Sequence, residues 1–205
     1  MQIEATKPLV DSPYNIRLIK LFNGLFEGPE NTQLVCALMD GRNGAADEPV
    51  YEPAGAGDGH DENTHHQIVF AHGYFSSALH EVAHWCVAGK ERRLLPDFGY
   101  WYRPDGRTQA QQLEFEQVEV KPQALEWLFS LASQRGFTAS ADNLAGEESS
   151  DLAFRLAVSA QARYYVEHGL PHRAKAFALK LEQEFGGSIT LNPLYWPEEL
   201  KGQQG

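Results

Sequence analysis

Residues 80–84 read His80-Glu81-Val82-Ala83-His84. All the remaining residues from position 78 to position 87 are apolar. Residues that are four apart lie on one face of an α-helix, with Cβ atoms about 5–6 Å apart. This separation allows His80 and His84 to bind one transition metal through neutral ring nitrogens, with Glu81 beside the ion. The pentapeptide therefore predicts a metal-binding helix.

Two other interpretations of this HExxH motif have to be weighed. A chain with 8 His and 28 Asp and Glu residues can contain the motif by chance, and two histidines four apart can lie on the exposed face of an amphipathic helix. The apolar residues around the motif instead indicate a helix that is buried nearly all round. Because buried imidazoles without a partner are unfavourable, metal binding is the favoured interpretation.

The residues on either side of the motif predict the elements that hold this helix. Residues 67–70 form a short apolar run that ends at His72-Gly73, which is typical of a strand followed by a turn. Ser76 or Ser77 is then expected to cap the helix, and Gly89 is expected to end it. A strand, a turn and a buried HExxH helix in this order predict a zincin-like core.

A third metal ligand is expected downstream, on a second helix. In zincins of the HExxH…E kind this ligand is a glutamate, and the candidates are Glu114, Glu116, Glu119 and Glu126. The helical pattern places Glu119 on the apolar side of the segment, whereas most of these glutamates are expected on a solvated face. Glu119 is the first choice and Glu116 the second. Pro122 is expected either in the first turn of this helix or at a kink.

The rest of the chain predicts an α+β fold. Apolar residues recur at helical spacing in residues 16–26, 149–169 and 173–185, and residues 34–39 have the composition of a strand. We expect a zincin-like core in which a small sheet packs against the buried HExxH helix, with several further helices around it.

The length of the chain predicts one catalytic domain, residues 1–205. No linker rich in Pro and Gly divides it into two halves. Residues 41–66 are rich in Gly, Asp and Glu and show neither helical nor strand periodicity, so they are expected to form a long loop. Residues 54–64 within this loop are interpreted as an insertion.

Charge and hydropathy exclude several classes of partner. A formal net charge of -11 argues against direct binding of nucleic acid. No signal segment and no membrane-spanning run is apparent, so cytoplasmic residence and no membrane partner are expected. Cys36 and Cys86 are too few for a disulfide framework.

Four blocks of the sequence together resemble the elongation factor P hydroxylases. The blocks are Ile68-Val69-Phe70-Ala71-His72-Gly73, the motif with its continuation His84-Trp85-Cys86, Asp97-Phe98-Gly99-Tyr100-Trp101-Tyr102, and Phe115-Glu116-x-Val118-Glu119-Val120-Lys121-Pro122. The resemblance implies that His80, His84 and Glu119 form a non-heme iron site. It also implies an iron-dependent oxidoreductase, a monooxygenase that uses dioxygen to hydroxylate the β-lysylated lysine of elongation factor P. This hydroxylation is the last step of that modification.

The ligand types alone leave the chemistry open. Two imidazoles and one carboxylate leave coordination positions at which iron(II) activates dioxygen. The same ligands with zinc hold a water that Glu81 can deprotonate as the general base of a metallopeptidase. A non-enzymatic adaptor that contains a metal and binds a translation factor is a further alternative. In a hydroxylase we expect Glu81 to orient a ligand or a metal-bound species; a purely structural role is the third possibility.

Overall fold

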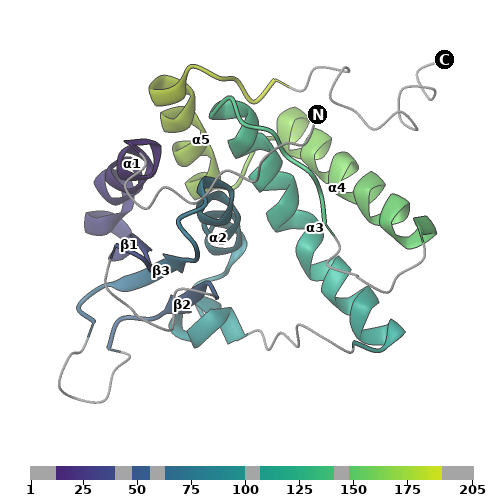
Figure 1. The fold of residues 1–205 in the computed structure, drawn as a ribbon, viewed down its shortest axis with the longest axis horizontal. Coiled ribbons are helices and arrows are strands. Elements are labelled where there is room, and N and C mark those ends of the chain that lie inside the picture. Colours follow the sequence, from purple (N-terminus) through teal and green to yellow (C-terminus); the bar gives the residue numbers. More distant parts are fainter. Residues whose placement is uncertain (1–12, 40–47, 56–62, 100–106, 141–147, 191–205) are drawn as a thin grey trace. The chain divides into compact units, whose positions relative to one another are not determined.

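The computed structural model describes residues 13–39, 48–55, 63–99, 107–140 and 148–190. The chain divides after Tyr100 into two compact units. Figure 1 shows helices and a small sheet, which confirms the expected α+β class. In chain order the elements are α1 (Pro13–Glu30), β1 (Thr32–Cys36), β2 (Val50–Glu52), β3 (His66–Phe70), α2 (Phe75–Val87), the short 3-10 turns η1 (Arg92–Leu94) and η2 (Pro96–Gly99), α3 (Gln109–Ala132), α4 (Glu148–His168) and α5 (His172–Phe185).

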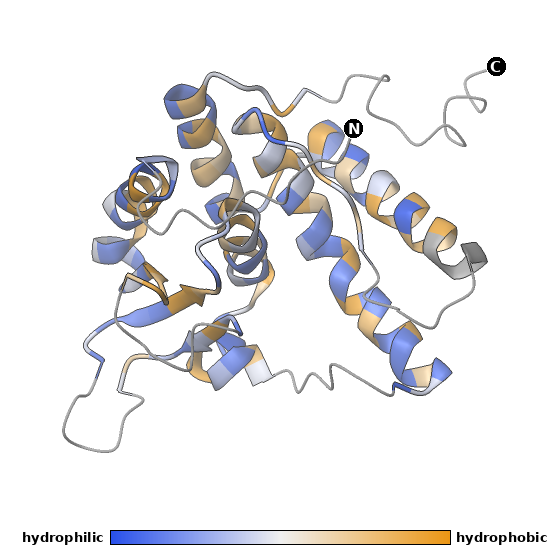
Figure 2. Ribbon diagram, in the orientation of Figure 1, coloured by the Kyte–Doolittle hydropathy of each residue, from blue (hydrophilic) through white to orange (hydrophobic). Residues whose placement is uncertain are grey.

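The first unit is built on a sheet with the strand order β1-β3-β2. β1 pairs with β3 in parallel, with Thr32 opposite His66, and β2 pairs with β3 antiparallel, with Val50 opposite Val69. The second half of β3 is buried and hydrophobic (Figure 2). A strand whose faces are covered by other elements carries a continuous apolar run in place of an alternating pattern.

The HExxH helix α2 packs against β3 and α1 in this unit. The Trp85 ring lies 5.3 Å from the Phe22 ring and 4.8 Å from the Phe26 ring, centroid to centroid, at steep angles. Phe22 and Phe26 are four residues apart and share the buried face of α1. The apolar face of α2 is therefore fixed by aromatic packing, which determines where its histidines point.

The second unit is helical in the described residues. α3 contacts both α4 and α5, and the rings of Phe129 and Phe177 meet edge to face with centroids 5.0 Å apart. A capping box joins the Thr108 and Gln111 side chains to the first turn of α3. The longest helix of the described chain thus has a defined start and is buried along much of its length.

Two local expectations are corrected by these elements. The stretch 41–66, expected as a loop, contains β2 and the first residue of β3. β2 is too short to show a periodic pattern, and pairing with β3 stabilises it. Helix α2 begins at Phe75 without a side-chain cap, because the preceding turn sets the start: His72 and Gly73 both have positive φ, and Asn15 Nδ2 donates to Gly73 O at 2.6 Å.

Pro122 lies in the interior of α3 and not in its first turn, so of the two expected positions the kink stays a prediction. Proline removes one backbone hydrogen bond from a helix at a cost of about 3 kcal/mol or more. Pro122 is buried, so packing of this part of α3 offsets that cost. Tertiary contacts of this kind are invisible to a local sequence pattern.

No helix in the described segments is long and apolar enough to cross a lipid bilayer. The expected cytoplasmic residence stays a prediction.

His66 is held neutral by its surroundings at the start of β3. The Ala54 N–H donates to its Nδ1 at 3.0 Å, and its ring stacks on that of Tyr51 with centroids 6.1 Å apart. Burial, and secondly the positive charge of Arg93, lowers the pKa of His66. The folded pKa therefore lies below the unfolded one, and the stability that neutral His66 contributes is lost as the pH falls below about 6.5.

We expect His66→Asn to weaken the pH dependence of stability between pH 7.5 and 5.5. Asparagine can offer an oxygen to the same donor but does not titrate in this range. Urea unfolding at a series of pH values measures the effect, with His172→Asn, a change at an exposed histidine on α5, as the control. An unchanged pH slope in His66→Asn would show that His66 is not linked to folding.

Candidate metal site

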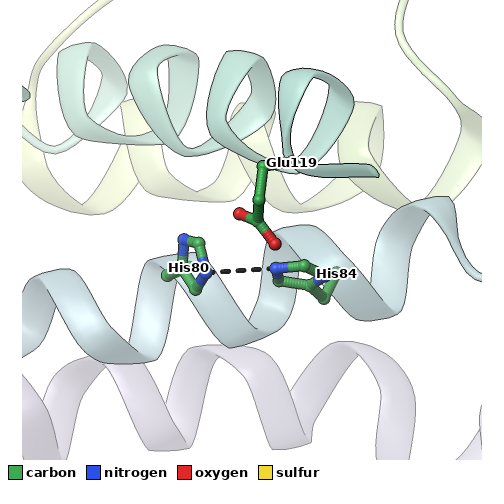
Figure 3. Close-up of side chains that lie close together, drawn as sticks. All are labelled: His80, His84 and Glu119. Atoms are coloured by element: carbon green, nitrogen blue, oxygen red, sulfur yellow. Dashed lines mark hydrogen bonds between the residues drawn. The ribbon is translucent and has the colours of Figure 1, made fainter. Parts of the chain in front are cut away.

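His80 and His84 lie side by side on α2, one helical turn apart (Figure 3). Their Nε2 atoms are 3.0 Å apart, and their ring centroids are 4.6 Å apart at an interplanar angle of 68°. His84 is buried and His80 is half-buried. Residues four apart are separated by only about 40° around the helix axis, so the two imidazoles share one face of α2.

The spacing of the two imidazole nitrogens fits a shared metal ion. Two nitrogen ligands that each lie about 2.1 Å from one ion are about 3.0 Å apart at a right angle and about 3.4 Å apart at a tetrahedral angle. The 3.0 Å between the Nε2 atoms of His80 and His84 falls at the right-angle end of this range. The sequence prediction that this motif brings two imidazole nitrogens together on one helix face is confirmed, whereas metal binding by them stays a prediction.

Glu81 follows His80 on α2 and is half-buried. General base, orienting group and structural carboxylate are all compatible with this location. The role of Glu81 stays a prediction.

The downstream glutamates differ sharply in burial along α3. Glu119 is 2% exposed, whereas Glu114 is exposed and Glu116 and Glu126 are half-buried. The expectation that Glu119 points inward is confirmed, and Figure 3 draws its side chain extending from α3. A buried carboxylate is unfavourable unless a cation or hydrogen-bond donors accompany it.

Two glutamines next to these glutamates were not singled out from the sequence. Gln123 Nε2 donates to Glu119 Oε2 at 3.3 Å, and Gln112 Nε2 donates to Glu116 Oε1 at 3.0 Å. Both glutamines are buried, and each lies four residues from its glutamate. The signal that could have found them is this regular spacing of 112, 116, 119 and 123, which places all four side chains on one helix face.

Three aromatic residues of the blocks that resemble the elongation factor P hydroxylases lie outside the residues that the structure describes. They are Tyr100, Trp101 and Tyr102. Phe98, which precedes them, is buried and stacks on Tyr51 with centroids 4.1 Å apart. For this one aromatic residue of the block, core packing is the observed role.

Comparisons with known proteins agree with the resemblance. A sequence profile of the elongation factor P hydroxylases matches residues 21–194, a range that includes the HExxH motif and Glu119. A Haemophilus influenzae protein named elongation factor P lysine hydroxylase is 51% identical over 175 residues, which make up 85% of this chain and 91% of the relative. The matched region extends well beyond the metal-binding motif and covers most of both proteins. The chain belongs to the elongation factor P hydroxylase family.

Proposed function

We propose that this chain is an enzyme that hydroxylates a lysine of elongation factor P. The observation that carries the proposal is the His80 and His84 pair, with Nε2 atoms 3.0 Å apart, in a chain that belongs to this family. The family profile and the 51% identical relative both have hydroxylation of elongation factor P in their names. In the finer form of the proposal the substrate lysine already carries a β-lysyl group, and hydroxylation completes the modification.

The proposed metal ligands are His80, His84 and Glu119. They are a group of residues that could hold a metal ion, and they supply two neutral nitrogens and one carboxylate oxygen. Glu119 is preferred to Glu116 because its carboxylate is the more deeply buried. The proposal retains the prediction of one catalytic domain with a zincin-like core.

We further propose that the native metal is iron(II) and that dioxygen is the co-substrate. Two histidines and one carboxylate with open positions are the ligand set of non-heme iron oxygenases. Iron(II) bound by these residues would activate dioxygen for the hydroxylation. Zinc also accepts this set, and its higher affinity for most nitrogen and oxygen sites makes it a frequent occupant.

The direct experiment is to incubate β-lysylated elongation factor P with this protein, iron(II), dioxygen and a two-electron reductant such as ascorbate, so that the second oxygen atom leaves as water, and then to measure the intact mass of the substrate. We expect a gain of one oxygen atom. The same reaction with zinc in place of iron should give no mass gain. Cleavage of the substrate with no oxygen uptake would favour the zinc peptidase, and tight binding with no product would favour the adaptor.

The effect of substituting Glu81 further distinguishes a zinc peptidase from a hydroxylase. In a zinc peptidase the general base is indispensable, whereas a group that orients a ligand is expected to contribute about 10–100-fold. We expect Glu81→Gln to keep a measurable fraction of oxygen incorporation, lowered within that range, because the amide retains the size and most hydrogen-bonding capacity of the carboxylate. The rate of oxygen incorporation measures this, and complete loss with intact metal binding would assign Glu81 a direct role in proton transfer.

A further inference from the structure

The chain that follows α3 runs back alongside the same helix (Figure 1). We call residues 133–140 the strap. Phe137 of the strap stacks on Trp127 of α3, with centroids 5.8 Å apart and planes 14° apart. Further along, Ser140 reaches Gln123. Later residues of the strap therefore contact residues nearer to the N-terminus of α3. The last of these contacts, at Gln123, lies one helical turn from Glu119.

Gln123 is the residue to which the end of the strap is bound. Its Oε1 accepts the Ser140 N–H at 3.0 Å, and its Nε2 donates to the Ser140 carbonyl at 2.7 Å. The side chain is 5% exposed. These two bonds fix which end of the amide is nitrogen, because only oxygen can accept the Ser140 N–H.

The amide nitrogen that is fixed in this way makes a further hydrogen bond. With the nitrogen held toward Ser140 O, Nε2 also donates to Glu119 Oε2 at 3.3 Å. A glutamine at this place thus links the strap backbone to the carboxylate proposed as the third metal ligand. Polar partners of this kind hold metal-ligating carboxylates in one orientation.

We propose that Gln123 is a positioning residue for Glu119 and that the strap sets the orientation of its amide. The inference rests on the proposed role of Glu119 as a metal ligand. A glutamate side chain has several rotatable bonds, so an unanchored carboxylate would lose conformational entropy on binding the ion. Gln123 reduces that loss by holding the carboxylate before the metal arrives.

The test is to titrate the intact protein with cobalt(II), with visible absorption as the readout of affinity and of ligand geometry. Gln123→Met retains the length of the side chain and removes both its donors and its acceptor. We expect this variant to bind cobalt about 10–100-fold more weakly and to shift the absorption bands. Gln123→Asn, which keeps an amide but shortens it by one methylene group, should lie between Gln123→Met and the unaltered protein and carries the test if Gln123→Met does not fold.

Phe137→Ala is the matched control. It removes the ring that packs the strap on Trp127 but leaves the Gln123 amide in place. We expect a lower melting temperature and a cobalt affinity within about threefold of the unaltered protein, since the ring itself contacts no proposed ligand. Equal losses of affinity in Phe137→Ala and in the Gln123 variants would overturn the proposal, because strap packing alone would then explain both.

Two further outcomes separate this inference from the proposed function. Unchanged cobalt affinity in the folded Gln123 variants, together with a large loss in Glu119→Ala, would refute only the positioning role of Gln123. Unchanged affinity in Glu119→Ala would instead refute the ligand assignment on which the inference rests.

Discussion

Replacing His84 with alanine is expected to abolish oxygen transfer to elongation factor P and to weaken metal binding by more than about 100-fold, beyond the range typical of residues that only support a ligand. The imidazole provides one of the two nitrogens that lie 3.0 Å apart on α2. With it removed, His80 is the remaining nitrogen ligand of the proposed set. Intact-mass measurement of the substrate and cobalt titration of the enzyme provide the two readouts, and His80→Ala should behave in the same way.

The control for this prediction is the same substitution at an exposed histidine. His172→Ala, in the first turn of α5, removes an imidazole without touching the proposed site and should leave activity and affinity unchanged. Circular dichroism establishes that His84→Ala remains folded. Full oxygen incorporation by folded His84→Ala would show that the HExxH motif is not the metal site.

Glu119→Gln is the second change for which we expect a large effect. The substitution preserves the size of the side chain but removes the negative charge that a divalent cation requires of its carboxylate ligand. Because Glu119 is 2% exposed, bulk water is poorly placed to fill the lost coordination position. We expect metal affinity to fall by more than about 100-fold, again beyond the effect of a supporting residue, and oxygen incorporation to be lost.

Glu116→Gln is the matched comparison on the same face of the same helix. Glu116 is half-buried and accepts a hydrogen bond from Gln112, so its neutral analogue should retain most of the metal affinity. Cobalt titration of both variants ranks the two carboxylates directly. The reverse ranking, with the larger loss in Glu116→Gln, would make Glu116 the third ligand.

The candidate site could be predicted from the sequence to the extent that it depends on helical spacing. Two histidines four apart must lie on one face of a helix, and the structure places them side by side on α2. The apolar neighbours of Glu119 likewise indicated that its side chain turns inward, which its burial confirms. Both predictions depend on the 3.6-residue period of the α-helix. That period fixes which residues of a segment lie on the same face, whatever the rest of the fold.

Features that depend on long-range contacts were missed. β2 consists of three residues whose pairing partners lie 15 to 19 positions further along the chain. The capping serines expected for α2 are not used, because a turn tied to Asn15 of α1 decides where that helix begins. In the sequence, Gln123 cannot be distinguished from any other polar residue of a helix. Its role depends on its hydrogen bonds to the strap, which lies further along the chain.

By itself, the sequence determined the family of this protein, the helix that carries HExxH and the face on which each candidate ligand lies. These properties follow from local periodicity and from the order of short motifs. Only the tertiary structure decided that Pro122 could be accommodated inside α3, that His66 is held as a neutral acceptor, and that Gln123 is anchored by Ser140. Each of these depends on burial or hydrogen bonding between residues distant in the chain, whose free energies are set by the packed environment and not by the neighbouring sequence.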